Sequence, residues 1–497
     1  MEYLLGIDVG TSACKTVVFD TGGCVVRSAE CGYAVNTPKA GYAEQDPLDW
    51  WRAVCKCTKK IAETFDMKKI SAVGTDGISW SAAALDSEGE PLCPTPIWMD
   101  TRAAKICGEY KKRIGEENIF NLCGNPLQPG YSTGKIIWYK RNFPSMYKKI
   151  NKVLQANSYI AYKLTGNMTH DASQGYGYHF YDIRNNRWDE RMAGAFGINL
   201  NLIPDLIMPW ETAGRISRTA SIETGLPEGL IAVAGGLDAA CGTLGAGVHK
   251  NLQTQEQGGQ AGGMSICTDS YKPHKKLITG RHVVPGCFLL QGGTVGGGGA
   301  LAWCAREFFG GEADAYETIN EMAEKIIAGS NGLIFLPYMS GERSPIWDSD
   351  AQGVFFGLGY EKTRAHMARA VMEGVAFSLL HNLQTANETG SSPATLYSSG
   401  GAAKSRLWTQ IKADVTAVPV AVPSAAEATA LGAALLAGVG AGIYKNFDEA
   451  VSKTVSVSRI HEPDRDAHER YMKFYEIYLE LYGKLKKTMK KIKRPLL

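Results

Sequence analysis

The sequence lacks long uninterrupted apolar segments. None of its apolar runs approaches the roughly 20 residues that a helix needs to cross a bilayer. The first residues, MEYLLGIDVG, carry no basic segment, and the apolar run among them is too short for a signal peptide. We therefore expect a cytoplasmic protein that has no membrane partner.

A one-sided charge is also absent. The 53 Lys and Arg residues nearly balance the 50 Asp and Glu residues, which leaves a net charge of +3. Binding of nucleic acid relies on many basic side chains that neutralise phosphates, so this balance argues against a nucleic-acid partner. The basic end KLKKTMKKIKR follows aromatic and Leu residues at helical spacing between 471 and 485. We interpret this region as a docked helix whose basic end is solvated.

Cysteine pairs at metal-binding spacing are lacking as well. The twelve cysteines are scattered, and none lies in a CxxC pair. Cys55 and Cys57 are nearest to each other, but no His or second Cys pair stands at the spacing of a zinc site. We interpret these two as ordinary helix residues and expect the thiols to be reduced, as in a cytoplasmic protein.

Tandem repeats and low-complexity tracts are missing too, which excludes a solenoid. Strand-like runs alternate instead with helix-like runs, and this alternation favours an α/β fold. The predicted helices include 47–65 and 363–383. The predicted strands are 3–8, 15–20, 70–77, 230–236, 332–338 and 395–401. Most of them end in Gly, Asp or a polar residue, and ligands in such folds bind at strand ends.

The length of 497 residues exceeds what one hydrophobic core usually serves, so we expect at least two domains. A strand, a Gly-containing turn and a second strand occur near 4–20 and again near 252–268. This repetition predicts two related halves that face each other across a cleft. We place the domains at 1–247 and 248–445, followed by a helical extension at 446–497.

The segment GIDVGTSACKTVVFD places Asp8 at the end of an apolar strand. Gly10, Thr11 and Ser12 follow in a tight turn, and Lys15 lies on the next strand. Backbone N–H groups of such a turn can cradle phosphate oxygens, and Lys15 can add positive charge where a transferred phosphoryl group needs it. A plain β-hairpin explains the same residues equally well. The string GYSTGKI is not a Walker loop, because its spacing is wrong and no Ser or Thr follows the Lys.

Further glycine clusters occur in QGGQAGG, LQGGTVGGGG and SSGGAAKS. None fits the G-x-G-x-x-G pattern that opens a dinucleotide-binding βαβ unit. Each cluster alone is typical of a turn. Together, after strands and before helices, they favour a phosphate-rich ligand, because helix N-termini and backbone amides suit anions.

Asp238 is the only charged residue in the run GGLDAACGTLGAGV, which spans 235–248. Two interpretations remain open at this point. The side chain can cap the helix that follows, because it stands after a Gly-Gly turn. It can also serve as a general base in a reaction, and both roles can hold at once.

The ordered strings in this sequence resemble the FGGY family of carbohydrate kinases, from residue 4 to about 440. This resemblance implies the two-domain α/β ATPase fold of actin, Hsp70 and hexokinase, which is ribonuclease H-like and has an interdomain cleft. It also implies phosphorylation of a sugar by ATP with Mg²⁺, most like the family members that act on D-xylulose. The strings are GIDVGTSACK, GYAEQDPLDWW, PIWMDTRA, GYSTGKIIWYKRN, VAGGLDAACGTLGAG, GLIFLPYMSGERSPIWDSDAQGVFFGL, RAHMARAVMEGVAF and SSGGAAKSRLWTQIKADVTAVPV.

The resemblance also implies roles for single residues. Asp238 is the expected base that takes the proton of the sugar hydroxyl, and Asp8 is the expected acid near Mg-ATP. The first domain would hold the sugar and the first phosphate turn, and the second would bind ATP. The implied substrate side comprises Ser79, Trp80, Asp100, Arg102 and Asp238. The implied ATP side comprises Gly10, Thr11, Ser12, Lys15, Gly258, Gly259, Gln260, Gly293, Thr294, Gly400, Gly401, Ala402 and Lys404.

The first departure from the family pattern concerns the sugar. Family members that act on D-xylulose typically carry GQMHG where this chain has GISWS, so Ser79 and Trp80 replace the Met and His that touch the ketose. An indole ring can stack on a sugar, but it cannot replace the hydrogen bonds of imidazole. Asp76 can supply an acceptor there or only cap the turn. Ribulose, rhamnulose, erythritol and gluconate therefore remain alternative substrates.

The second departure lies in the second phosphate turn. The family usually has a Gly-Thr-Ser type of sequence there, and in this chain Gly259 replaces the Thr. Gln260 or the backbone amides can substitute for the lost hydroxyl. This departure keeps open a nucleotide-gated sugar-binding regulator with little turnover. Sugar and ATP are the expected partners, and a homodimer stays an alternative to a monomer.

Overall fold

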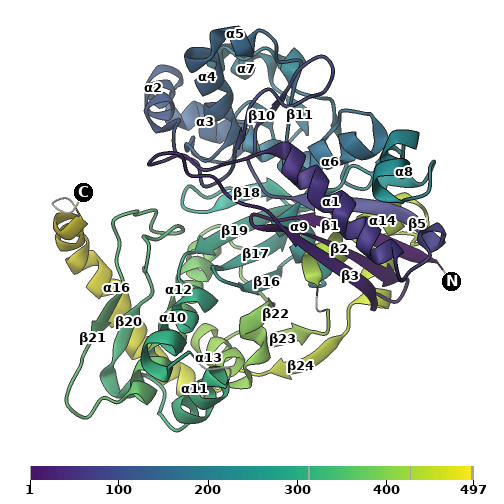
Figure 1. The fold of residues 1–497 in the computed structure, drawn as a ribbon. Coiled ribbons are helices and arrows are strands. Elements are labelled where there is room, and N and C mark those ends of the chain that lie inside the picture. The colour runs from purple at the N-terminus through teal and green to yellow at the C-terminus, as the bar shows by residue number, and fades with distance from the viewer. Residues whose placement is uncertain (1, 312–313, 426, 494–497) are drawn as a thin grey trace.

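The computed structural model describes residues 2–311, 314–425 and 427–493, and two seven-stranded mixed sheets organise the chain (Figure 1). The first sheet has the order β13-β14-β5-β1-β2-β3, and β15 also pairs with β5. β1 runs parallel to β5 and antiparallel to β2. Its strands are β1 (Tyr3–Val9), β2 (Ala13–Asp20), β3 (Val25–Gly32), β5 (Ile70–Gly77), β13 (Thr212–Arg215), β14 (Ile231–Val233) and β15 (Gly236–Leu237).

The second sheet repeats this pattern of pairing. Its order is β18-β19-β17-β16-β22-β23-β24, with β16 parallel to β22 and antiparallel to β17. The repetition seen in the sequence at 4–20 and 252–268 therefore corresponds to the hairpins β1–β2 and β16–β17. The strands are β16 (Gln253–Gly258), β17 (Gly262–Thr268), β18 (Ile278–Arg281), β19 (Phe288–Thr294), β22 (Thr395–Ser399), β23 (Val420–Pro423) and β24 (Val457–His461).

A long insertion between β5 and β13 forms a lobe that lies beyond the first sheet (Figure 1). Its own apolar core includes Tyr139, Tyr178 and Phe180. One short strand pair joins the lobe to the segment before β5: β4 (Glu44–Gln45) with β7 (Thr95–Pro96). The other short pairs lie within the lobe: β6 (Ala83–Leu85) with β8 (Lys152–Leu154), β9 (His170–Asp171) with β12 (Leu206–Ile207), and β10 (Tyr181–Asp182) with β11 (Arg187–Trp188). Its helices are α2 (Ala104–Ile114), α3 (Glu116–Cys123), α4 (Ser132–Asn142), α5 (Pro144–Tyr147), α6 (Ala156–Thr165), α7 (Glu190–Phe196) and the 3₁₀ turns Ala172–Gly177 and Leu200–Leu202.

Helices cover both sheets. α1 (Pro47–Ala62) packs on β2 and β3, while α12 (Arg364–Asn387) contacts β17 and β19. Both helices were predicted from the sequence. The others are α8 (Arg218–Thr224), α9 (Asp238–Gly245), α10 (Gly298–Phe309), α11 (Ala315–Glu324), α13 (Arg406–Thr416), α14 (Ala428–Gly440), α15 (Phe447–Thr454) and the 3₁₀ turns Met67–Lys69, Ser330–Gly332 and Gly401–Lys404.

The C-terminal helix α16 (Arg465–Lys493) docks as the sequence predicts. The side chains of Tyr471, Tyr475 and Tyr478 are buried against α12 and α13. Within the described residues no helix is both long and apolar enough to span a membrane. The twelve cysteines are free thiols, and Cys55 and Cys57 lie within α1.

Two predicted strands differ from the expectation. The segment 230–236 breaks into β14 and β15, because Gly235 adopts a left-handed conformation between them. The segment 332–338 forms β20 (Ile334–Leu336), which pairs with β21 (Val354–Phe356) and joins neither large sheet. Its apolar residues pack instead beneath α12.

Helix α14 packs against the first sheet, although it follows β23 of the second sheet in the chain. It lies on β1 and β5 and crosses α9 at very close range. A Cβ atom on Gly245 would overlap the backbone carbonyl of Ala428, and one on Gly432 would overlap that of Cys241. Glycine at these two positions therefore lets the two helices touch backbone to backbone.

Candidate active site

The β1–β2 turn is a tight hairpin that neighbouring side chains hold in place. The amide of Gly10 donates to the Ala13 carbonyl at 3.0 Å, and the Tyr33 hydroxyl donates to the Gly10 carbonyl at 2.7 Å. Gln45 Nε2 donates to the Thr11 carbonyl at 2.7 Å. Both interpretations of the turn are compatible with this geometry, because a fixed hairpin can also present its amides to an anion.

Three carboxylates meet at one end of the first sheet. Asp8 and Asp76 stand opposite each other in the parallel pairing of β1 and β5. Asp238 begins α9 directly after β15, whose Leu237 pairs with Gly77 of β5. Side chains at the carboxyl ends of adjacent strands share one edge of a sheet, which explains their proximity.

The electrostatics of this cluster favour a proton or a cation. Burial raises the pKa of Asp238 to about 7, and the charge of Asp8 contributes. Burial raises the pKa of Asp8 to about 6, against the lowering effects of Asp76 and Lys15. Burial, with the nearby Asp8 and Asp238, raises the pKa of Asp76 well above its usual value.

Asp76 is the acid of this cluster to which the sequence assigned no settled role. Its side chain is fully buried, and both carboxylate oxygens lack an N–H or hydroxyl donor among the described residues. An uncompensated buried carboxylate is costly for the fold. Such a group in a cleft is typical of a functional site, and its place at the end of the apolar strand 70–77 was the available sequence signal.

The structure distinguishes the two interpretations of Asp238. Helix α9 begins at Asp238, and the capping position is occupied by Leu237, whose side chain makes no capping hydrogen bond. The Asp238 carboxylate accepts a hydrogen bond from the amide of Ala239, at 2.6 Å. The residue is half-buried. Its carboxylate therefore stands in the first turn, outside the usual capping position, and can serve chemistry.

Lys15 is held by two glutamates. Its Nζ lies 3.1 Å from Glu427, which precedes α14, and 3.4 Å from Glu30 on β3. Burial opposes the charge, but these ion pairs raise the pKa of Lys15 above its usual value. Lys15 also lines a cavity of about 510 Å³ together with Gly400, Gly401 and Lys404, three of the predicted ATP-binding residues. To contact a phosphate, Lys15 would exchange a glutamate for it.

A second cavity, of about 830 Å³, has the volume of an ordinary small-ligand site. Residues from several helices complete it, and sequence reasoning did not identify them, because helix packing brings them together from distant positions. These are Leu301, Ala302, Tyr316, Glu317, Asn320, Ser405 and Trp408, next to Gly298. Six predicted ATP-side residues line the same cavity: Gly258, Gly259, Gln260, Gly401, Ala402 and Lys404.

The second phosphate turn, between β16 and β17, is fastened to α10. The amides of Gly298 and Gly299 donate to the carbonyls of Gly259 and Gln260 at 2.7 and 2.9 Å. Gly293 and Thr294 end β19 beside this turn, where they contact the loop 342–344. The Gly293 amide donates to the Ser344 hydroxyl at 2.6 Å, and Arg343 donates to the Thr294 carbonyl at 3.3 Å.

Trp80 lies in an aromatic cluster at the substrate side, directly after Ser79. Its ring stacks on Tyr131 with the ring centres 4.0 Å apart, and the Tyr176 ring meets it edge-on at 5.8 Å. The indole N–H is buried and has no hydrogen-bond partner among the described residues. Tyr131 therefore covers one face of the indole and Tyr176 meets its edge, so protein rings already surround part of the side chain that the sequence assigned to the sugar.

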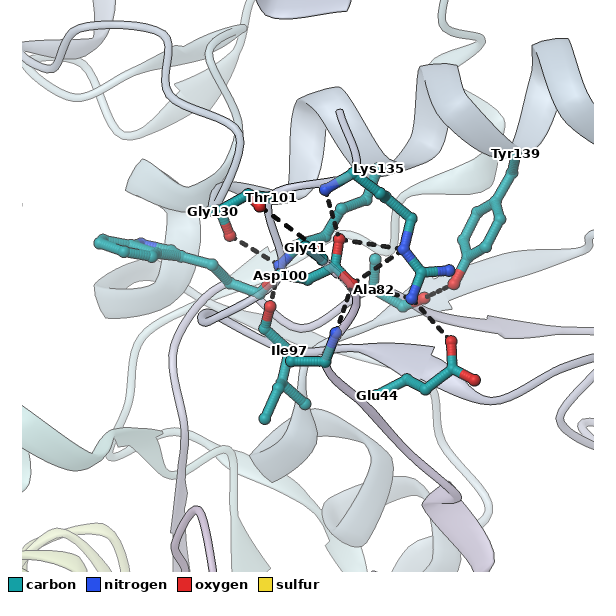
Figure 2. A network of polar contacts seen from close by, with 12 residues as sticks. Gly41, Glu44, Ala82, Ile97, Asp100, Thr101, Gly130, Lys135 and Tyr139 are labelled. Atoms are coloured by element: carbon teal, nitrogen blue, oxygen red, sulfur yellow. Dashed lines mark hydrogen bonds and ion pairs between the residues drawn. The ribbon is translucent and has the colours of Figure 1, made fainter. Parts of the chain in front are cut away.

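Asp100 and Arg102 belong to a buried polar network (Figure 2). Asp100 accepts hydrogen bonds from the Ala43 amide at 2.8 Å and from Arg102 Nε at 2.8 Å. Arg102 also contacts Glu44 at 2.6 Å and stacks on the Tyr42 ring at 3.8 Å. The structure thus places the charged groups of both predicted substrate-side residues against protein partners.

The loop 342–344 bridges the two halves of the molecule. Arg343 lies 5.9 Å from the ring centre of Trp98, whose indole N–H donates to the Thr11 hydroxyl at 3.1 Å. Burial raises the pKa of Glu342 to about 7. Its Oε1 accepts from the amides of Val295 and Arg343, whereas Oε2 is buried and finds no partner among the described residues. The family strings contained Trp98, Glu342 and Arg343, but only the fold brings them together.

Comparisons with known proteins agree with this geometry. Family models described as the N-terminal and C-terminal domains of the FGGY family of carbohydrate kinases match residues 3–245 and 267–441. A xylulose kinase of Staphylococcus epidermidis is 30% identical over 98% of this chain and 97% of its own length. The structure of a xylulose kinase from Rhodospirillum rubrum superposes with a TM-score of 0.91 at 26% identity, covering 98% and 100% of the two chains. A gluconate kinase from Lactobacillus acidophilus gives 0.92 at 26% identity, covering 99% of each.

Proposed function

Because the chain belongs to the FGGY family of carbohydrate kinases, we propose that it transfers the γ-phosphoryl group of ATP to a terminal hydroxyl of a ketopentose, D-xylulose first. The observation that carries the proposal is Asp238, a half-buried carboxylate beside Asp8 whose pKa of about 7 suits a general base near neutral pH.

Asp238 is proposed to orient the sugar hydroxyl and to take its proton late in the transfer. Phosphoryl transfer passes through a loose transition state, so the protein mainly aligns the oxygen with phosphorus and neutralises charge. As the sugar oxygen bonds to the γ-phosphorus, the bond from phosphorus to the bridging oxygen breaks and ADP leaves, and the proton of the sugar hydroxyl moves to a carboxylate oxygen of Asp238. Closure of the two halves over the substrates would exclude water and limit hydrolysis of ATP.

Asp8 and Asp76 are proposed to hold the Mg²⁺ that accompanies ATP. Carboxylate oxygens are the hard ligands that Mg²⁺ prefers, and the two acids lack other cationic partners apart from the nearby Lys15. Among the described residues no group of three or more acidic, His or Cys side chains is arranged to hold a metal. This fits an ion that is bound by one or two carboxylates together with phosphate oxygens. Bound Mg²⁺ would neutralise negative charge on the phosphates.

ATP is proposed to occupy the cavity formed by the second phosphate turn and the turn at 400–404. The amides around Gly259 and Gln260 would face the phosphates, and Lys404 would add charge. Tyr316, Asn320 and Trp408 are the new candidates for contacts to the nucleoside, because they line the same cavity.

The site supports a neutral sugar over a sugar acid. Asp8, Asp76 and Asp238 give it negative charge, which repels the carboxylate of gluconate unless that group lies far from the cluster. A gluconate kinase is nevertheless among the similar structures, so gluconate remains the principal alternative. The domain limits 1–247, 248–445 and 446–497 stay part of this proposal.

A coupled ADP-release assay tests the proposal. The panel comprises D-xylulose, D-ribulose, L-rhamnulose, erythritol and D-gluconate, each with Mg-ATP and each against a no-sugar blank. We expect the highest kcat/KM with D-xylulose. Absence of sugar-stimulated ADP across the whole panel would contradict the kinase function and leave the nucleotide-gated regulator as the better description.

Asp238→Ala tests the assignment of the base in the same assay. A lost general base should lower the rate about 10²- to 10⁴-fold. Circular dichroism confirms that the variant is folded. Near-normal phosphorylation by folded Asp238→Ala would show that another group takes the proton.

A further inference from the structure

Lys135 is a fully buried cation on α4 that the proposed reaction leaves without a role. Its Nζ donates hydrogen bonds to three backbone carbonyls: those of Trp80 at 2.7 Å, Ile97 at 2.7 Å and Gly130 at 2.6 Å. Figure 2 shows this ammonium group between the three segments, close to Asp100.

The arrangement requires the charged form of the side chain. An ammonium group has three N–H donors, one for each carbonyl, whereas a neutral amine has two. Keeping a charge in the interior is costly, and burial lowers the pKa of Lys135 to about 7. An apolar side chain would fill the same space on α4 without this penalty, so the three carbonyl contacts need a reason.

The three carbonyls belong to segments that each carry an aromatic residue. Trp80 carries its own ring, Trp98 follows Ile97, and Tyr131 follows Gly130. We call Trp80, Trp98 and Tyr131 the aromatic wall.

The rings of the aromatic wall connect to the reaction centre. Trp80 stacks on Tyr131, and Trp98 donates to Thr11 in the first phosphate turn. Tyr176 touches the edge of Trp80, and its pKa is raised by burial and by the charge of Asp238.

The backbone of Trp80 needs such support. Its φ of +60° lies in the left-handed region, which a bulky residue rarely adopts. Strained conformations of this kind persist only where surrounding contacts determine them. The hydrogen bond from Lys135 to the Trp80 carbonyl is one of these contacts, and the same ammonium ties it to the two other segments.

We propose that Lys135 is a positioning residue that fixes the aromatic wall and thereby sets which sugar the enzyme accepts. It acts through three backbone carbonyls and does not itself touch the sugar. This inference rests on the proposed sugar-kinase function, because selectivity among sugars is its readout.

The test compares Lys135→Met and Lys135→Arg with the matched control Tyr139→Phe. Methionine removes the charge and all three donors. Arginine keeps the charge, but its larger planar group cannot take the place of one nitrogen atom on which three carbonyls converge. Tyr139 lies one turn further along α4 and donates to the Ala82 carbonyl at 3.0 Å, so its variant loses a buried hydrogen bond of the same helix and spares the three carbonyls.

The readouts are the KM for sugar, the KM for ATP, and the ratio of kcat/KM for the two best sugars of the panel. That ratio is independent of the fraction of enzyme that is folded. Misplacement of substrate-positioning groups by about 1 Å can cost roughly 100-fold. We expect both Lys135 variants to raise the sugar KM about 10-fold or more and to lower the selectivity ratio at least about 5-fold, with the ATP KM within about 2-fold of wild type.

Two outcomes would overturn the inference. One is a selectivity ratio in the Lys135 variants equal to that of an active wild-type enzyme. The other is an equal change in Tyr139→Phe, which would indicate a general effect of loosening α4. A wild-type enzyme that phosphorylates no sugar of the panel overturns the proposed function first, and this inference with it.

A measurement on the wild-type protein decides the matter where both Lys135 variants fail to fold. Hydrogen exchange is followed with and without the best sugar of the panel. The segments 78–82, 96–99 and 129–132 should gain protection together on sugar binding, because one ammonium joins them. Protection of one segment without the others would overturn the inference.

Discussion

Asp238 and its two neighbouring acids affect folding and catalysis in opposite ways. The proposed catalysis needs the ionised carboxylate of Asp238, but burying that charge lowers the stability of the fold. The pKa of Asp238 is raised from 3.8 to about 7 in the folded protein, so folding favours its protonated form. Ionisation therefore lowers the free energy of unfolding, and this loss is complete above about pH 7 and absent below about pH 4. We therefore expect a protein with this site to have a lower free energy of unfolding in the pH range where the carboxylate is ionised and can act as a base.

Asp238→Asn tests this competition. Asparagine keeps the shape and removes the charge, so without ligands it should raise Tm at pH 8 by about 2–4 °C, and the gain should shrink as pH falls toward 5. A residue that only caps α9 would give no such gain, because Asn and Asp cap about equally well. Thermal melts at the two pH values provide the measurement.

The pH dependence of kcat/KM in the wild-type enzyme should report the same ionisation of Asp238. The kcat/KM for the best sugar should fall on the acid side of about pH 7, where Asp238 becomes protonated. The residual activity of Asp238→Asn should lack this acid limb, and a limb that persists in the variant would point to another titrating group.

Asp76→Asn addresses the proposed Mg²⁺ site. The substitution removes one of two adjacent buried carboxylates, so we expect the affinity for Mg-ADP to fall about 10-fold or more, with little change for ADP measured without the metal. Isothermal titration of the variant and wild type with ADP, in the presence and absence of Mg²⁺, checks this. Equal affinities of the two proteins for Mg-ADP would exclude Asp76 from the metal site and leave contact with the sugar as its role.

The turn between β16 and β17 differs from the family pattern by one hydroxyl. Gly259 does not have a positive φ, and a Cβ atom there would meet its nearest neighbour, the Ala261 carbonyl, at 3.5 Å. A Cβ atom therefore fits at this position. Gly259→Thr should lower the KM for ATP about 3- to 10-fold, the effect of one added hydrogen bond, and should leave the sugar KM unchanged.

Gly259→Ala is the matched control, because it adds the Cβ atom without the hydroxyl. Steady-state kinetics at varied ATP give the comparison. If threonine is no better than alanine, the backbone amides of the turn, fastened to α10 by Gly298 and Gly299, already suffice for the phosphates.

Several strands and helices were predictable from the sequence, since their apolar patterns are local. The strands β1, β2, β5 and β22 and the helices α1, α12 and α16 occur where apolar periodicity and punctuation indicated. The sequence indicated a Gly-Gly turn at 235–236, but it did not indicate that the chain pairs with the sheet again as β15 directly after Gly235. Pairing of β20 with β21 outside the large sheets depends on packing beneath α12, which no local signal reports.

The candidate site also contains residues that the sequence indicated and residues that only the fold brings together. Asp8 and Asp238 were predictable, because acids at strand ends stand out in apolar surroundings. Lys135 was not, since its string matched the family without indicating a role for the lysine, and its three carbonyl partners lie up to 55 residues away in the chain. Trp80 and Tyr131 likewise meet only after the insertion between β5 and β13 has folded back.

At the scale of the whole molecule, a shared apolar core connects the two halves of the sequence. Leu4, Val17 and Ala72 of the first sheet share one apolar core with Leu431 and Leu435 of α14. The side chains on this face are buried in the folded protein, where α14 packs on β1 and β5. The proposed boundary near 247 therefore separates sequence segments without separating cores.

A fragment of residues 1–247 should accordingly be insoluble or aggregate when expressed alone, because the face beneath α14 is left bare. Fusing residues 427–442 to its end through a flexible linker should restore soluble, folded protein. Size-exclusion chromatography and circular dichroism of the two fragments make the comparison, and a soluble, monomeric, folded 1–247 fragment would show that α14 is dispensable.

The position of α14 also has a consequence during synthesis. The strands of the first sheet that it covers leave the ribosome by residue 77, but the helix ends at residue 440. At typical elongation rates of about 5–20 residues per second, the nascent chain carries this bare apolar face for roughly 20–70 s. Throughout that interval we expect the growing polypeptide to need protection from aggregation, until α14 has been made and covers the face.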